Sequence, residues 1–168
     1  MSEKIFKTAE GPFTLLDQGA YRVEKNRLSA QAGAQHLGFQ VQRLAVGHFA
    51  CPYHGHQNQE ELFLILEGRA LLRGPEGVKP LVAGDLVFCP TGEALAHQLY
   101  NPGPEPCLYF SCSNQTETER GYYPDTGKVI DYKLGPDQRW EMTQPVDYWA
   151  GEENPAAFWP EGSLEWPG

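Results

Sequence analysis

Short apolar segments separated by glycine and proline turns dominate the middle of the chain. Residues 37–46 alternate in part between apolar and polar side chains, which is typical of a strand. Residues 61–67 predict another strand, in which Glu61, Phe63 and Ile65 share one face and three leucines share the other. Because both faces are apolar apart from the carboxylate, we expect this strand to be buried on both sides.

Five more strands are predicted at similar spacing, and strong turn signals separate them. Gly74-Pro75-Glu76-Gly77 and Pro90-Thr91-Gly92 are two of these turns. No helical period competes with this pattern, so the sequence predicts an all-β antiparallel sandwich or barrel. The remaining strands are expected at 53–56, 69–73, 81–89 with a bend at Gly84-Asp85, and 97–101, followed by 107–112.

The charge and length of the chain narrow its class. Its 168 residues predict one domain. A net charge of −9 predicts no binding to nucleic acid and no docking on anionic membranes. The longest apolar run is too short to cross a bilayer, and the N-terminus lacks the apolar region of a signal peptide. We therefore expect a cytoplasmic protein with four free thiols, in which Cys51 is a small buried residue rather than a catalytic one.

Three histidines and a glutamate make the clearest candidate site. His54 and His56 are two apart, so an extended strand would point both imidazoles to one face, with Cα atoms roughly 6.5–7 Å apart. Glu61 and His97 would complete a mixed nitrogen and oxygen set for a divalent first-row metal. The odd spacing from His56 to Glu61 requires a turn or bulge at 57–59 to bring both side chains to one face.

The residues around these four resemble the two signature motifs of the cupin superfamily. The match departs from the family pattern by one extra residue before His54 and two before His97, both in predicted turns. The resemblance implies a double-stranded β-helix, a jelly-roll barrel with the metal inside. The first motif runs Gly47, His54, His56, Glu61 and Gly68, and the second runs Gly84, Pro90, Gly92, His97 and Asn101.

The same resemblance implies the metal ligands and their chemistry. Glu61 is preferred to Glu60 because it leaves the six residues before Gly68 that the family has. His36 and His48 do not fit the motifs and are interpreted as surface or loop residues. The implied site is octahedral with two open positions, and iron, manganese, nickel and zinc all suit it. Binding requires neutral imidazoles, so occupancy is expected to fall as pH drops through about 6. The implied ligands are His54, His56, Glu61 and His97.

We divide the chain into an N-terminal arm at 1–30, a cupin barrel at 31–115 and an irregular, aromatic-rich C-terminal extension at 116–168. The extension is expected to pack on its own barrel or to cross to a second subunit, and a homodimer is expected. Tyr123-Pro124-Asp125 resembles a short motif that follows the barrel in many small bacterial cupins of unassigned function. The four tryptophans all lie in the extension, at 140, 149, 159 and 166.

Three functions are compatible with a metal-binding cupin. The first is a metal-dependent enzyme on a small anionic or oxygenated molecule, acting as a dioxygenase, decarboxylase, lyase or isomerase. The fold hosts many activities, so it does not select among them. The alternatives are a sugar-phosphate isomerase-like cupin and a non-catalytic module that binds a small molecule. The sequence contains no DNA-binding domain of the kind that sensors carry, which favours a stand-alone enzyme.

The expected lining of the pocket rests on strand parity. A sugar phosphate would need cations facing the pocket, and Arg43 is one candidate. Arg69 and Arg73 alternate with two apolar residues that are expected to face inward, which places these arginines outside. The best candidates for the substrate pocket share parity with a metal ligand and are Phe63, Ile65 and Leu99.

Overall fold

The computed structural model describes residues 2–135 and 140–167. Strands are the main regular secondary structure of this region, with one short α-helix and two 3-10 helices. The helices are α1 (Leu28–Ala32), η1 (Glu93–Leu95) and η2 (Pro155–Phe158). The strands are β1 (Thr14–Gln18), β2 (Tyr21–Asn26), β3 (Leu37–Leu44), β4 (Gly55–His56), β5 (Glu61–Glu67), β6 (Arg69–Gly74), β7 (Gly77–Val82), β8 (Leu86–Cys89), β9 (Gln98–Tyr100), β10 (Cys107–Asn114), β11 (Thr118–Tyr123), β12 (Lys128–Leu134) and β13 (Trp140–Met142).

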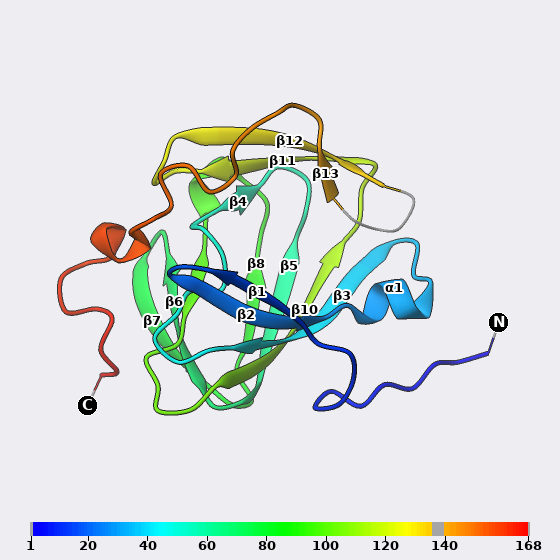
Figure 1. The fold of residues 1–168 in the computed structure, drawn as a ribbon, viewed down its shortest axis with the longest axis horizontal. Coiled ribbons are helices and arrows are strands. Elements are labelled where there is room, and N and C mark those ends of the chain that lie inside the picture. Colours follow the sequence, from blue (N-terminus) through cyan, green and yellow to red (C-terminus); the bar gives the residue numbers. More distant parts are fainter. Residues whose placement is uncertain (1, 136–139, 168) are drawn as a thin grey trace.

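The strands form a barrel of two antiparallel layers (Figure 1). One layer is a six-stranded sheet in the order β1-β2-β3-β10-β5-β8. The other contains the sheets β7-β6-β9 and β13-β12-β11-β4, which a β-bridge between His54 and His97 joins. Neighbouring strands such as β3, β10 and β5 are distant in sequence, as in a jelly roll. The predicted all-β double-stranded β-helix is confirmed.

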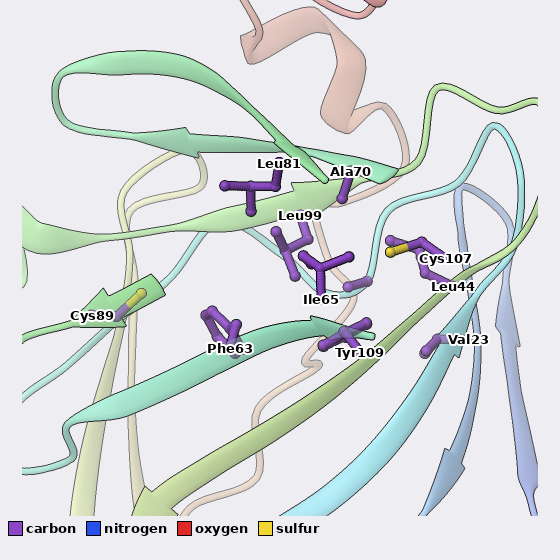
Figure 2. Packing of buried hydrophobic residues seen from close by; sticks show 11 residues of the cluster. Val23, Leu44, Phe63, Ile65, Ala70, Leu81, Cys89, Leu99, Cys107 and Tyr109 are labelled. Atoms are coloured by element: carbon purple, nitrogen blue, oxygen red, sulfur yellow. The ribbon is translucent and has the colours of Figure 1, made fainter. Parts of the chain in front are cut away.

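The hydrophobic core lies between the layers of the barrel (Figure 2). Val23 and Leu44 are paired across β2 and β3 and are fully buried. Ile65 and Leu99 approach each other from opposite layers, next to Tyr109 (Figure 2). Alternation along each strand places these side chains on the inner face, where burial of each large one contributes roughly 1.5–3 kcal/mol.

Two of the strand predictions differ from the structure, one in its bounds and one in its burial. The strand expected at 81–89 is divided into β7 and β8, because Gly84 has a φ of +97° and the Asp85 carboxylate accepts the Val82 N–H at 2.8 Å. The expectation that β5 is buried on both faces is wrong for its outer face, where Leu62 is 37% exposed. Helix α1 and N-terminal residues such as Phe6 pack on another part of this surface.

Residues outside the expected barrel also contribute to it. Residues 14–26 of the expected N-terminal arm form β1 and β2, which extend the six-stranded sheet. Residues 118–134 of the expected extension form β11 and β12, and β11 pairs with β4 through Gly121 and His56. Within the described part of the chain, no helix has the length and apolar character needed to cross a bilayer.

The last residues of the chain pack on their own barrel. Trp159, next to η2, is buried against Phe49 and Leu71. Its indole N–H donates a hydrogen bond of 2.6 Å to the side-chain oxygen of Gln98 on β9. Trp166 lies beneath the guanidinium of Arg69 at 4.4 Å. Figure 1 shows this segment following the side of the barrel near β6 and β7.

Candidate metal centre

The barrel brings the four predicted ligands together. One donor atom from each of His54, His56, Glu61 and His97 lies within 4.8 Å of the others. His56 lies on β4, Glu61 begins β5 and His97 precedes β9. Two backbone hydrogen bonds between His54 and His97, of 2.8 and 3.2 Å, join the two sheets of one layer at the site.

The irregular segment predicted at 57–59 is present between β4 and β5. Glu119 of β11 holds it, because one carboxylate accepts the backbone N–H groups of Gln57 at 2.7 Å and Asn58 at 3.1 Å. The break in the strand resets the alternation, so that Glu61 faces the same space as His56.

Each imidazole has a neighbour that orients it. The Nδ1 of His54 is 2.9 Å from the carbonyl oxygen of Pro52, so Nδ1–H donates there and Nε2 is left for a metal. The Nδ1 of His56 is 3.8 Å from Glu119 Oε1, and its Nε2 is 3.5 Å from Glu61 Oε2. The Nε2 of His97 is 2.9 Å from the same Glu61 oxygen. Glu61 therefore connects two of the imidazoles.

Burial and mutual charge shift the pKa values of these groups strongly. Burial, with the nearby His97 and His56, lowers the pKa of His54 to about 3. Burial opposes the charge on His56, but the Glu119 and Glu61 carboxylates outweigh it and raise the pKa of His56 to about 9. Burial likewise disfavours the Glu61 carboxylate, yet His56 and His97 hold its pKa well below the usual range. A metal ion that binds here would therefore displace a proton from His56.

The donor set fits a divalent metal ion. Both ring nitrogens of His56 and the Nδ1 of His97 are buried without a hydrogen-bond partner among the described residues. Buried polar atoms without partners are costly, and a bound ion would satisfy those that face the centre. Three imidazole nitrogens and one carboxylate oxygen suit iron, manganese, nickel and zinc. This His-His-Glu-His group could therefore hold a metal ion.

Glu60, His36 and His48, which were not expected to be metal ligands, lie outside the metal centre. Glu60 is exposed, and its backbone N–H donates to the Asn114 side chain at 2.7 Å. His36 is exposed, and His48 is partly exposed with its Nδ1 2.7 Å from the Val46 carbonyl oxygen. None of the three belongs to the cluster of possible ligands.

Two adjoining cavities open onto the centre, and His54 and His56 line both. The polar cavity has a volume of about 380 Å³, and the aromatic cavity has a volume of about 640 Å³. The residues that line these cavities come from strands that are distant in sequence, so strand parity alone did not predict them. The polar wall includes Gln40, Ser111 and Ser113. The aromatic wall includes Tyr123, Tyr132, Tyr148 and Trp149, and Lys25, Arg27, Gln59 and Trp140 line both cavities.

The three residues expected in the substrate pocket lie in the hydrophobic core. Phe63 is 6% exposed, Ile65 1% and Leu99 3% (Figure 2). They face the interior, as their parity requires, but they do not line the polar or the aromatic cavity. Alternation identifies the inner face of a strand and leaves open how far along the strand the pocket begins.

The three arginines considered for phosphate binding make other contacts. Arg43 pairs with Glu24 at 2.7 Å, and Arg69 donates to the Gly103 carbonyl oxygen. Arg73 makes two hydrogen bonds with Asp125, of 2.6 and 2.8 Å. None of these arginines lines either cavity at the centre. Arg69 and Arg73 were expected outside the pocket.

Cys51 borders the aromatic cavity, with its sulfur 3.7 Å from His54 Nδ1. Burial raises the pKa of its thiol to about 12, so the neutral thiol dominates at physiological pH. All four cysteines of the chain are free.

Comparisons with known proteins agree with this architecture. Residues 40–112 match the family model of the cupin domain. A comparison with curated proteins finds no relative that matches the chain. A solved cupin-superfamily protein from Silicibacter pomeroyi, named sugar phosphate isomerase, has a TM-score of 0.63 and 24% identity, over 80% of this chain and 89% of its own.

Two further solved structures share the fold at lower identity. A predicted oxalate decarboxylase from Thermotoga maritima has a TM-score of 0.58 and 19% identity, over 67% of this chain and 100% of its own. A polyketide cyclase from Streptomyces resistomycificus has a TM-score of 0.58 and 16% identity, over 67% of this chain and 80% of its own. At these identities the likeness shows a fold and not a reaction. The motifs, the barrel and the family-model match agree that residues 40–112 resemble a cupin domain.

Proposed function

We propose that this protein is a metal-dependent enzyme that acts on a small anionic or oxygenated molecule. The observation that carries the proposal is the convergence of four metal-ligand donor atoms within 4.8 Å, beside two cavities large enough for a small substrate. The ion would be iron, manganese, nickel or zinc. The reaction would be that of a dioxygenase, decarboxylase, lyase or isomerase.

The chain's own residues would hold and surround the ion. His54, His56, Glu61 and His97 would ligate it, and Glu119 and the Pro52 carbonyl would orient two of the imidazoles. A bound divalent ion supplies Lewis acidity and lowers the pKa of a bound water. With one carboxylate ligand and three neutral imidazoles, the loaded site would carry a net charge of about +1, which favours an anionic substrate.

A sugar-phosphate isomerase is the second candidate, because a solved structure with this fold carries that name. Its substrate would need several cations or donors for a phosphate. Arg43, Arg69 and Arg73 make contacts away from the site, and Lys25 and Arg27 are the described cations that line the polar and aromatic cavities. We rank this function below the general proposal, and a non-catalytic binding module below both.

Elemental analysis of tag-free protein tests the proposal. We expect about one equivalent of a first-row metal in the wild type and none in the His54→Ala/His56→Ala double variant. Glu61→Gln should weaken metal binding, and Glu60→Gln should leave it unchanged because Glu60 lies outside the cluster. Full metal occupancy in the double variant would overturn the metal site. A greater loss with Glu60→Gln would mean that the carboxylate ligand is the other glutamate.

Turnover separates an enzyme from a binding module. The metal-loaded protein would be screened against carboxylates, phenols and sugar phosphates for dioxygen uptake, carbon dioxide release and isomerisation. Metal-dependent turnover that disappears in the double variant supports an enzyme. Tight binding of a screened compound without its conversion supports the module instead.

A further inference from the structure

Lys25 occupies a position that the fold otherwise gives to core residues. On β2, Tyr21 and Val23 point into the barrel and are buried, and Lys25 is the next residue of that face. Across the sheet its partner is Gln42, which is buried and hydrogen-bonded to Ser111 at 3.1 Å. The inner face therefore changes from apolar to polar at Lys25, toward the end of the barrel that holds the metal centre.

No side chain in the described ranges pairs directly with this lysine, although the Glu61 carboxylate attracts its charge at longer range. The ion pairs and hydrogen bonds found there include none for Lys25, whereas Lys128, the other lysine withdrawn from solvent, contacts Glu152 at 2.9 Å and two backbone carbonyls. Burial lowers the pKa of Lys25. A partly buried ammonium group without a partner destabilises the fold. An anionic ligand bound beside Lys25 would neutralise this group.

The carboxylates of the centre are already engaged. Glu119 accepts the backbone N–H groups of Gln57 and Asn58, and Glu61 lies between two imidazoles. With a divalent ion bound, Glu61 would be a ligand. Lys25 would then face a site of net positive charge across cavities that it shares with His54 and His56. An anion entering these cavities would meet attraction from both sides.

The aromatic wall indicates the rest of the ligand. The Tyr123 ring lies nearly parallel to the His54 imidazole, 6.1 Å away at 18°, and Tyr148 meets Tyr123 edge-on at 5.6 Å. Trp149 continues the wall next to Tyr148, at 4.8 Å. Such rings pack well against flat apolar groups. The many hydroxyls of a sugar phosphate would instead need polar partners on this side.

We propose that Lys25 binds the carboxylate of the substrate, and that the substrate is a small carboxylic acid with an aromatic or apolar body. This inference rests on the proposed function and names its substrate class. The carboxylate lies between Lys25 and the metal centre, with Ser111 and Ser113 as further donors. The apolar body lies against Tyr123, Tyr148 and Trp149.

Benzoate binding by calorimetry tests the inference on metal-loaded protein, with metal content measured on the same samples. Lys25→Met keeps most of the length of the side chain and removes its charge, and should weaken benzoate binding about 10- to 100-fold. Lys25→Arg should recover part of the affinity. The matched control is Lys79→Met, because Lys79 is exposed on β7, pairs with Glu76 and lines neither the polar nor the aromatic cavity. Benzamide, the neutral analogue, should bind weakly and equally to the wild type and Lys25→Met.

Thermal unfolding distinguishes a lysine that binds a ligand from a lysine that stabilises the fold. Lys25→Met should have an equal or higher melting temperature, because it removes a partly buried charge that the described chain leaves unpaired. A clear fall in melting temperature would show that Lys25 serves the fold and would overturn its assignment as a ligand-binding residue.

The remaining outcomes separate this inference from the proposed function. Unchanged benzoate affinity in Lys25→Met at wild-type metal content would overturn the role of Lys25 and leave the metal proposal standing. Tighter binding of inorganic phosphate than of benzoate would overturn the carboxylate class, as would no benzoate binding by the wild type. Absence of metal from the wild type would refute the metal proposal alone, and the comparison of Lys25→Met with the wild type would still decide whether Lys25 binds the anion.

Discussion

At the scale of single residues, Glu119 connects the fold to the metal centre. Its buried carboxylate holds the turn between β4 and β5 through two backbone N–H groups. The same carboxylate lies 3.8 Å from the Nδ1 of His56. A carboxylate behind a metal-bound histidine fixes the orientation of the ring and increases the basicity of the ligand. Glu119 therefore acts on two ligands, since the turn also determines where Glu61 points.

Replacing Glu119 should weaken metal binding without removing a ligand. We expect Glu119→Gln to reduce metal affinity about 10- to 100-fold, because the neutral amide attracts the His56 proton less and accepts fewer hydrogen bonds from the turn. Glu117→Gln is the matched control, since Glu117 is exposed just before β11. Competition with a chromogenic chelator measures both affinities. Equal affinities in the two variants would show that Glu119 supports the turn without tuning the ligand.

The ligands could be predicted from the sequence, whereas their supporting residues could not. His54 and His56 are local to each other, and the spacing of glycines relates them to Glu61 and His97. Glu119 and Lys25 come from strands whose neighbours depend on the order of the whole sheet. No local pattern distinguishes a lysine that faces the cavity from one that faces solvent when the pairing of its strand is unknown.

At the scale of elements, the bounds of a strand could be predicted where most of its residues are apolar. The bounds of β5 agree with the predicted 61–67 because apolar residues fill nearly every position. β1 falls in the segment expected as an N-terminal arm, because it lies at the edge of its sheet, with mostly exposed residues and little apolar patterning. The aromatic C-terminal segment has no period at all. Its position is determined by individual buried side chains, of which Trp159 is the largest near η2.

Replacing Trp159 tests how much the C-terminal segment stabilises the barrel. Trp159→Ala should lower the free energy of unfolding by about 3–5 kcal/mol, because it removes a buried indole and leaves the Gln98 side-chain oxygen without its donor. Trp166→Ala is the control and should cost about 0.5–1 kcal/mol, since Trp166 is partly exposed and stacks on Arg69. Urea unfolding measures both. Similar small losses in the two variants would show that the segment contributes little to its own barrel.

At the scale of the whole molecule, the outer face of the six-stranded sheet carries exposed apolar side chains at its β8 edge. Leu86 is 64% exposed and Phe88 55%, both on the edge strand β8. They pair with Leu64 and with the exposed Leu62 on β5, which makes the patch continuous across two strands. An exposed edge strand with apolar side chains favours association with another chain.

A second copy of this chain is the partner we expect on that patch, because the face of one copy can pair with the same face of another about a two-fold axis. Light scattering after size exclusion should give twice the chain mass of 18.8 kDa for the wild type. Leu86→Asp should shift the protein to the monomer mass, because the charge would be buried at the centre of the contact. Leu15→Asp is the matched control, since Leu15 is 50% exposed on β1 at the opposite edge of the same sheet and should leave the dimer intact. A monomeric wild type would refute the dimer. A wild-type dimer that Leu86→Asp does not dissociate would place the contact on another face of the barrel.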